Sequence, residues 1–358
     1  MPKFSKTPYV TQKDIARVAK VSQAAVAAAL GRTTKIRISP QTRKRILKTV
    51  AQLNYTPNHF ASITRLGRSR QVAVIANSAM LQCVVQRLRF LSKFLMQKGL
   101  STVSHELEWT NRTLEQAWDE VLASRAEGII LSSSFGSIST SATRKLLKSP
   151  VPTISLYGPD ISSIPLLAPD LRAAFRELTS HLIQSGRRNL VFLKSSYLQE
   201  SETRTNWKGA ERRAGFLDAV RENEVEETCS VVELEREVLE TTVEHHLGIQ
   251  GLAEILTRSG GQPPDAVICI NDNFALGVIS EAVRLKIDVP GQMAVTGCDG
   301  EDWTGFGALP ITTIVQPSEA LARSASELLL AMLEGKSPAA ARTFLPCEIV
   351  WRASCPKN

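Results

Sequence analysis

Over most of the chain, short apolar runs alternate with segments whose apolar residues recur at helical spacing. The run QVAVIAN at 71–77 is followed by CVVQRLRFLSKFLMQKGL at 83–100, which places its apolar residues on one helix face. Further helix-and-strand pairs follow at 113–134 and 172–196. This alternation predicts an α/β fold of parallel sheets with helices on both faces. A body of this length predicts two such sheets, with ligands gathered at the carboxyl ends of the strands.

The amino-terminal part has a different pattern, which predicts three short helices. Thr11 is placed to cap the first helix, in which Ile15 and Ala19 share one face. Ser22 is placed to cap a second, Ala-rich helix after a break of a few residues. A third helix begins after Ser39, with a proline in its first position. Two short helices joined by a tight turn, the second slim enough to enter a major groove, predict a helix-turn-helix.

Positive charge is concentrated in the same part of the chain. Residues 1–71 contain fifteen Lys and Arg against the single acid Asp14, a net charge of +14, and the remainder carries −6. Four of these cations lie between Arg43 and Lys48, on the outer face of the third predicted helix. On an isolated helix such a run indicates a solvated face. Within so basic a segment it favours contact with the phosphates of nucleic acid.

Composition and motifs exclude several other classes of protein. No apolar stretch approaches the ~18 residues of a membrane span, and the start lacks a secretion signal, so we expect a cytoplasmic protein without a membrane partner. The histidines lack metal-ligand spacing, and we expect no metal and no cofactor. The patterns G-x-G-x-x-G, G-x-x-x-x-G-K-[ST] and G-x-S-x-G are absent, so we expect no enzyme. The scattered cysteines are expected to be reduced thiols: Cys83, Cys229, Cys269, Cys298, Cys347 and Cys355.

Three motifs follow one another in the amino-terminal part. T-x-x-D-I-A-x-x-A-x-V-S begins at Thr11, S-P-x-T-R at Ser39, and Y-x-P-N at Tyr55. Together they resemble the headpiece of lactose-repressor-type (LacI/GalR) bacterial transcription regulators. The resemblance implies a DNA-binding headpiece at 1–56 and a hinge at 57–70. The headpiece residues expected to contact DNA are Thr11, Ser22, Gln23, Ala24, Ala28, Ser39, Thr42 and Arg43.

The side chains of the second predicted helix determine which bases the headpiece is expected to recognise. Gln23 can pair bidentately with adenine, whereas Ala24 and Ala28 offer only apolar contact, for example to a thymine methyl. We therefore expect an operator discriminated by Gln23, methyl contacts and DNA shape. Lys20 stands where a turn glycine is usual in the family, so the turn must tolerate a side chain. Ala27 replaces a usual serine, which removes a phosphate contact.

The stretch PNHFASITRLGRSR corresponds to the family's hinge helix, which orders on the operator and inserts a Leu into the minor groove. In this chain Thr64 stands at the inserting position, so either a neighbour intercalates or the DNA kink is smaller. Asn58, Thr64 and Arg65 are the expected hinge contacts to DNA. The alternative is that this stretch is only a flexible basic linker.

The resemblance continues through the body of the chain, in E-G-I-I-L at 127–131 and R-x-x-G-F at 212–216. It implies an effector-binding and dimerisation domain at 71–358, made of two subdomains of periplasmic-binding-protein type. Three crossovers are expected near Ala168, Val295 and Pro317. The expected subdomains are roughly 71–167 with 295–317, and 168–294 with 318–358.

Arg212, Asn271 and Asp299 match effector-contacting positions of the family. An Arg fork, an amide and a carboxylate can together hold the hydroxyls of a small polar molecule. Ser78 and Tyr157 are candidates by position after their strands alone. The competing interpretation is an internal ion pair between Arg212 and Asp299. Many sugar-binding relatives stack an aromatic from the loop after R-x-x-G-F, and 229–243 contains none in this chain.

Taken together, the resemblance implies a homodimer that binds a pseudo-palindromic operator in double-stranded DNA. A small polar effector, for which a sugar is one candidate, would modulate the affinity for that operator. The family favours a repressor over an activator. A solute-binding sensor with the same body is the main rival, but it leaves the +14 amino-terminal charge unexplained.

Overall fold

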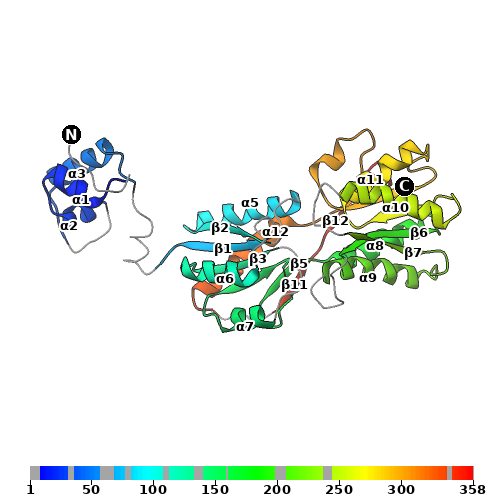
Figure 1. Ribbon diagram of the computed structural model, residues 1–358, viewed down its shortest axis with the longest axis horizontal. Helices are drawn as coiled ribbons and strands as arrows, with labels where there is room; N and C mark the ends of the chain where they lie inside the picture. Colours follow the sequence, from blue (N-terminus) through cyan, green and yellow to red (C-terminus); the bar gives the residue numbers. More distant parts are fainter. Residues whose placement is uncertain are drawn as a thin grey trace. The chain divides into compact units, whose positions relative to one another are not determined.

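The computed structural model consists of two units, residues 1–69, which include the headpiece, and residues 70–358, the body (Figure 1). The division lies one residue from the boundary expected between hinge and body. The structure describes residues 9–30, 36–56, 68–76, 82–107, 113–132, 140–158, 160–197, 207–236, 244–336 and 341–357.

The headpiece contains three helices: α1 (Gln12–Ala19), α2 (Gln23–Ala29) and α3 (Pro40–Gln52). Ile15, Val26 and Ile46, one from each helix, are fully buried in a shared apolar cluster. The predicted caps are present. The Thr11 hydroxyl accepts the Asp14 N–H while the Asp14 carboxylate accepts the Thr11 N–H, which closes a capping box at α1. Sequence and structure therefore agree on where each headpiece helix begins.

The body holds two six-stranded sheets. In the first sheet all pairings are parallel, with the order β11-β5-β4-β3-β1-β2. Helices α5 and α12 cover one face, and α6 and α7 cover the other. The strands are β1 (Gln71–Ala76), β2 (Ser101–Glu106), β3 (Gly128–Ser132), β4 (Thr153–Leu156), β5 (Leu166–Pro169) and β11 (Arg342–Leu345). The helices are α5 (Gln82–Gln97), α6 (Leu114–Ala123), α7 (Thr140–Lys148) and α12 (Ser318–Leu333).

Strand β1 shows why this sheet needs helices on both sides. Val72 and Val74 lie in the cluster beneath α5 and α12, while Ala73 and Ile75 lie in the cluster beneath α6 and α7. All four side chains are at most 1% exposed. Successive side chains of a strand point to opposite faces, so a continuous apolar run must be covered twice.

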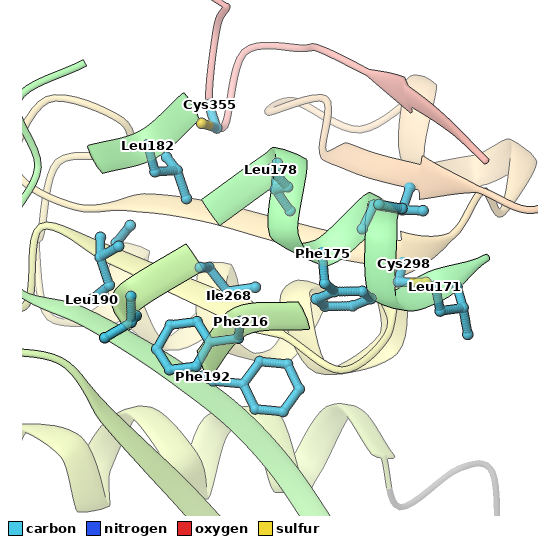
Figure 2. Packing of buried hydrophobic residues seen from close by; sticks show 14 of the residues in the cluster. Leu171, Phe175, Leu178, Leu182, Leu190, Phe192, Phe216, Ile268, Cys298 and Cys355 are labelled. Atoms are coloured by element: carbon cyan, nitrogen blue, oxygen red, sulfur yellow. The ribbon is translucent and has the colours of Figure 1, made fainter. Parts of the chain in front are cut away.

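The second sheet has the order β12-β10-β9-β8-β6-β7, and only its edge strand β12 runs antiparallel. Helices α8 and α9 cover one face, where Phe175, Phe192 and Phe216 pack together (Figure 2). Helices α10 and α11 cover the other. The strands are β6 (Leu190–Tyr197), β7 (Ser230–Arg236), β8 (Ala266–Cys269), β9 (Ala294–Asp299), β10 (Thr312–Val315) and β12 (Glu348–Val350). The helices are α8 (Leu171–Gln184), α9 (Trp207–Glu222), α10 (Glu244–Arg258), α11 (Asp272–Arg284) and the short η4 (Asp302–Gly305).

The predicted composition of the two subdomains was wrong for two segments of the chain. Strands β9 and β10 were expected with 71–167, but β9 pairs with β8 and β10 pairs with β9, so 294–315 belongs to the second sheet. Helix α12 conversely packs on the first sheet. The chain passes between the sheets after β5 and after β10, close to the expected Ala168 and Pro317, and again between β11 and β12. The crossing expected near Val295 does not occur, because Val295 lies inside β9.

Three further properties bear on the expected function class. Among the described residues, every helix is too short or too polar to span a bilayer. Within the same ranges, no group of three or more His, Cys, Asp or Glu is arranged to hold a metal ion. All six cysteines are free thiols, and four of them are buried.

Candidate DNA-reading surface and effector site

Helix α2 exposes only its first turn and one edge to solvent. Gln23 and Ala24 are exposed, and Ala27 is partly exposed. Ala28, which we expected to contact bases, is only 8% exposed. Ala25, Val26, Ala28 and Ala29 are the buried residues of the helix. Of the three residues expected to read bases, the structure thus exposes Gln23 and Ala24 and places Ala28 on the inner face.

Three of the residues expected to contact DNA through a hydroxyl, Thr11, Ser22 and Ser39, act as helix caps. Ser22 Oγ accepts the Ala25 N–H at 3.1 Å, and Ser39 Oγ accepts the Thr42 N–H at 3.2 Å. Ser39 and Thr42 hydroxyls also lie 2.9 Å apart. Arg43 on the next turn is exposed. These groups lie at the amino-terminal ends of α2 and α3, where helix N–H groups favour phosphate.

The turn between α1 and α2 accommodates Lys20 at the position where a glycine is usual. Lys20 adopts a left-handed conformation, φ 52° and ψ 53°, and its N–H is bonded to the carbonyls of Ala16 and Arg17. Its side chain is exposed, so the lysine is compatible with the space available. The conformation still carries the steric penalty of a Cβ in this region.

Four of the expected contacts lie outside the described residues. They are Asn58, Thr64 and Arg65 in the hinge and Ser78 after β1.

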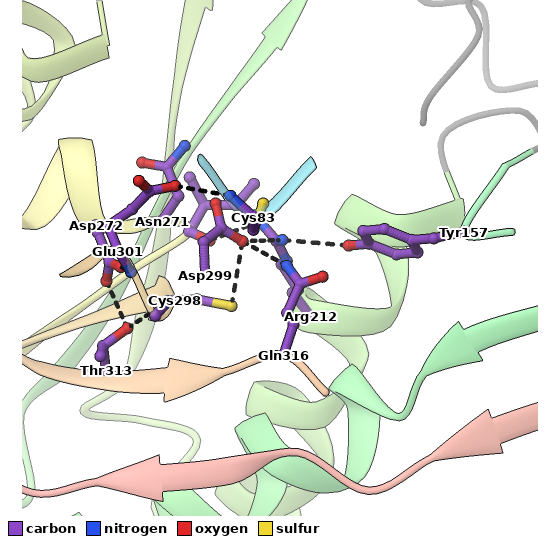
Figure 3. Close-up of polar contacts among 12 residues, drawn as sticks. Cys83, Tyr157, Arg212, Asn271, Asp272, Cys298, Asp299, Glu301, Thr313 and Gln316 are labelled. Atoms are coloured by element: carbon purple, nitrogen blue, oxygen red, sulfur yellow. Dashed lines mark hydrogen bonds and ion pairs between the residues drawn. The ribbon is translucent and has the colours of Figure 1, made fainter. Parts of the chain in front are cut away.

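Arg212 of α9 is the centre of a buried polar network in the body (Figure 3). Its Nη2 donates to Asp299 Oδ1 at 3.0 Å and to the Tyr157 hydroxyl at 3.2 Å, and its Nη1 donates to the Ile270 carbonyl at 2.7 Å. The Arg212 and Asp299 side chains are 10% and 4% exposed. The structure therefore brings three of the five expected effector residues together. It also contains the internal ion pair that was the competing interpretation.

The network joins elements of both sheets. Asp299 ends β9 of the second sheet, while Tyr157 directly follows β4 of the first. Gln316, which follows β10, donates its amide to Asp299 Oδ1 at 2.6 Å and accepts from Arg87 Nη2 of α5 at 3.1 Å. Both ends of this chain of contacts, Arg87 and Tyr157, belong to the first subdomain, while Arg212 and Asp299 in its middle belong to the second. A change in the network therefore changes contacts between the subdomains.

Asn271 lies beside this network and has a local structural role. Its Oδ1 caps α11 by accepting the Phe274 N–H at 3.0 Å, and its Nδ2 donates to Glu244 Oε2 at 3.0 Å. Glu244 also accepts from Asn273 Nδ2 at 3.2 Å. The amide of Asn271 is therefore already engaged at both of its ends in this conformation.

Burial affects the pKa of two aspartates of the site, Asp299 and Asp272. Burial raises the pKa of Asp299, although Arg212 opposes the rise. Burial also raises the pKa of Asp272 well above its usual range, and the neighbouring Asp299 adds to this rise. Asp272 accepts the Glu301 N–H at 2.9 Å and is bonded to the Thr313 hydroxyl. Gly297 leaves room for this carboxyl, because a Cβ there would lie 2.2 Å from Asp272 Oδ1.

Two residues of the network adopt backbone conformations that side chains disfavour. Asp299 has φ 117° and Tyr157 has φ 53°. Non-glycine residues in such regions cost roughly 1–3 kcal/mol each and concentrate at functional sites. Both side chains point into the network and hold Arg212 between them.

Arg87 and Gln316 were not identified from the sequence. Arg87 is fully buried, and its spacing from Val84 and Leu91 places it on the buried stripe of α5. That spacing was the available signal for Arg87. Gln316 carried no comparable signal, because a lone glutamine after a strand is an ordinary loop residue.

Comparison with known proteins agrees with both units. Residues 11–58 match the family model described as bacterial regulatory proteins, lacI family, and residues 179–355 match the periplasmic binding protein-like domain. The HTH-type transcriptional repressor CytR of Escherichia coli K12 is 24% identical over 344 residues, covering 96% of each chain. Catabolite control protein A of Priestia megaterium is 24% identical, over 96% of this chain and 99% of its own.

A solved structure gives the same result for the fold. The lac repressor dimer bound to operator and the anti-inducer ONPF superposes with a TM-score of 0.81 at 22% identity, covering 97% of this chain and 99% of its own. The helix-turn-helix with capped helices, the two parallel sheets and these matches lead to one assignment. The chain combines a DNA-binding domain of the lacI family of bacterial regulatory proteins, at 11–58, with a periplasmic binding protein-like domain at 179–355.

Proposed function

We propose that this protein is a sequence-specific transcription repressor whose affinity for operator DNA is set by a small molecule bound at the Arg212–Asp299 network. One observation carries the proposal: a capped helix-turn-helix that exposes Gln23 and a body whose buried polar network joins two subdomains occur in one chain. The match of 11–58 to the lacI family supports the DNA-binding half. It also disfavours a solute-binding sensor without an operator.

For DNA recognition, Gln23 is the residue that reads a base edge and Ala24 contacts a methyl group. The cap hydroxyls of Ser22 and Ser39 and the exposed Arg43 bind phosphate and fix the register of α2 in the groove. With little direct base reading, DNA shape contributes much of the specificity. The protein acts as a homodimer in the cytoplasm, with two headpieces reading the halves of a pseudo-palindromic site. It performs no catalysis.

For regulation, the effector competes with the contacts that Arg212 makes inside the protein. The pair with Asp299 holds the second subdomain together internally, while the bond to Tyr157 connects it to the first. A ligand that takes over the guanidinium or the carboxylate alters the relative position of the subdomains. Effector and operator are then linked ligands, with a coupling free energy of about 1–3 kcal/mol.

The test of the DNA half is an operator selection. Full-length protein is used to enrich a randomised duplex pool, and the enriched sequence is titrated by fluorescence anisotropy at several salt concentrations. We expect a two-fold symmetric sequence and an affinity that falls steeply with salt, because the basic headpiece displaces counterions. Gln23→Ala should lose preference at one base position in each half-site. Gln52→Ala, which removes an exposed glutamine from the end of α3, should not.

The test of the regulatory half uses the same titration with a library of metabolites. A hit must change the affinity for the selected operator, and Arg212→Met must remove the change. Failure of the pool to enrich any sequence would refute the proposed function. Unchanged base preference in Gln23→Ala would refute the role of Gln23 alone.

A further inference from the structure

Arg87 is a charged side chain that the body buries without a charged partner bonded to it. It lies on α5 with 0% of its surface exposed. Its Nη2 donates to Gln316 Oε1, and its guanidinium carbon lies 4.9 Å from the centroid of the Tyr157 ring. In the part of the chain that the structure describes, Nε and Nη1 of Arg87 have no hydrogen-bond partner. A guanidinium stays protonated under any physiological condition, so this is a permanently buried charge.

Such an arrangement is unfavourable for the protein alone. A buried charge is tolerated when it is paired and when its donors are satisfied, and a single amide acceptor and an aromatic ring supply only part of this. A fold that keeps Arg87 in this place therefore has a reason other than stability. Among the described residues, this environment lacks an acceptor for Nε and Nη1 of Arg87.

Two further buried donors have no partner among the described residues. Arg212, which donates to the Tyr157 hydroxyl, has a buried Nε without a partner among the described residues, and so does the Ser132 hydroxyl. Ser132 ends β3, where it is paired in register with Leu156, the residue before Tyr157. Within the described residues, three side-chain nitrogens of the two arginines and the Ser132 hydroxyl thus have no partner. All of them can donate.

The carboxylates nearby do not meet this need. Asp299 already accepts from Arg212 and Gln316, and Asp272 accepts from the Glu301 N–H and the Thr313 hydroxyl. Glu244 accepts from Asn271 and Asn273, and Glu301 accepts the Cys83 N–H at 3.3 Å. Each of these acidic groups already accepts from donors of the protein. Among the described residues, none of them accepts from Nε or Nη1 of Arg87 or from Nε of Arg212.

We infer that the effector is an oxyanion, a small molecule with a carboxylate or phosphate group, and that Arg87 binds this group. The inference rests on the proposed function and specifies the ligand class of the same site. Arg87 and Arg212 would then divide the ligand between them. Arg87 pairs with the charged group, and the Arg212–Asp299 pair meets the hydroxyls or amides of the remainder. A neutral sugar fits this donor excess less well.

The first experiment uses simple oxyanions on the full-length protein. Thermal unfolding is followed in chloride and in inorganic phosphate or acetate at equal pH and ionic strength. Wild type should gain a saturable rise in midpoint with the oxyanion, and Arg87→Gln should bind it at least about tenfold more weakly, because a charged hydrogen bond is lost. Arg89→Gln is the matched control, since Arg89 is an exposed arginine on the same helix. The anion that acts, acetate or phosphate, identifies the group.

Three results would overturn the inference. The first is a wild type without a saturable response to either anion, and the second is an equal response in Arg87→Gln and Arg89→Gln. The third is a large fall of the Arg87→Gln midpoint in chloride. An arginine whose only role is to stabilise the fold would give this fall, whereas replacing a buried arginine whose donors are only partly satisfied should leave the midpoint close to that of wild type.

The second experiment compares matched ligands and separates this inference from the proposed function. Glucuronate and glucose 6-phosphate are compared with glucose by their effect on binding to the selected operator. We expect at least one of the acids to change operator affinity in wild type and Arg89→Gln but not in Arg87→Gln. If neutral sugars act and acids do not, the inference fails and the proposed function stands. If no operator can be selected at all, the proposed function fails and this inference with it.

Discussion

Gln316 donates its amide to Asp299 at 2.6 Å, and this contact fixes the orientation of the glutamine. Because the amide nitrogen faces Asp299, the amide oxygen faces Arg87. One neutral side chain thus separates the carboxylate from the buried guanidinium and satisfies part of each. Gln316 also stands immediately after β10, where the chain leaves the second sheet for α12 of the first.

Replacing this glutamine tests its bridging role. Gln316→Leu leaves Asp299 with one donor fewer and Arg87 without its acceptor, so we expect a loss of about 1–3 kcal/mol in the free energy of unfolding. Urea denaturation followed by circular dichroism measures it. Gln250→Leu, an exposed glutamine on α10, should change stability by less than about 0.5 kcal/mol. Equal effects of the two substitutions would contradict the bridge.

The buried pair of Arg212 and Asp299 should behave as a unit. Arg212→Met and Asp299→Asn each leave a buried group without its partner, and each is expected to lower stability by about 3–5 kcal/mol. The double variant should lose clearly less than the sum of the two, which a double-mutant cycle in urea measures. Arg213→Met removes the exposed neighbouring arginine and serves as the control. Strict additivity would show that the pair does not interact.

Asp272 predicts a specific dependence of stability on pH. Its pKa in the folded protein is raised well above the usual 3.8, chiefly by burial. Between the unfolded and folded pKa values the native state therefore holds more protons, and stability falls as pH rises through this window. Asp272→Asn removes the titration while its amide can still serve the Glu301 N–H and Thr313. The stability difference between variant and wild type should therefore grow in favour of the variant as pH rises above the unfolded pKa. A difference that is constant with pH would contradict the raised pKa.

Lys20 predicts a gain of stability in the headpiece. A residue with a side chain in the left-handed region costs ~1–2 kcal/mol. Glycine avoids this steric cost, but ordering its more flexible backbone costs ~0.5–1 kcal/mol. Lys20→Gly should therefore stabilise the headpiece by about 0.5–1 kcal/mol. Amide hydrogen exchange of α1 and α2 in the full-length protein measures the change. Lys20→Ala keeps the Cβ and should show no gain, so equal slowing of exchange in both variants would contradict a steric penalty from the Cβ.

The sequence predicted those features that depend on local physics. Thr11, Ser22 and Ser39 were correctly identified as caps. A hydroxyl just before a helical apolar repeat is placed to accept a free backbone N–H of the first helical turn. The alternation of apolar runs with helical segments likewise predicted a sheet covered on both faces, as the burial of Val72–Ile75 confirms. The face of Ala28 was not predicted, because an alanine in an Ala-rich helix gives almost no amphipathic signal.

Features that depend on distant parts of the chain were harder to predict. The crossing near Val295 was expected from the family resemblance, and the apolar run of β9 contains no information about which strands lie beside it. The environment of Arg87 depends on Gln316 and Tyr157, which lie far from it in sequence. Arg212 and Asp299 were identified through family resemblance, but their pairing with each other became definite only in three dimensions.

The crossings of the chain between the two sheets have a consequence for biosynthesis. Strands β11 and β12, at 342–350, form one edge of the first sheet and one edge of the second. The ribosome must therefore complete nearly the whole chain before either sheet can acquire its last strand. The three headpiece helices, by contrast, are complete by Gln52. Since domains generally fold as units during synthesis, the headpiece can form long before the body, and the body is the later step that decides whether a newly made molecule can be regulated.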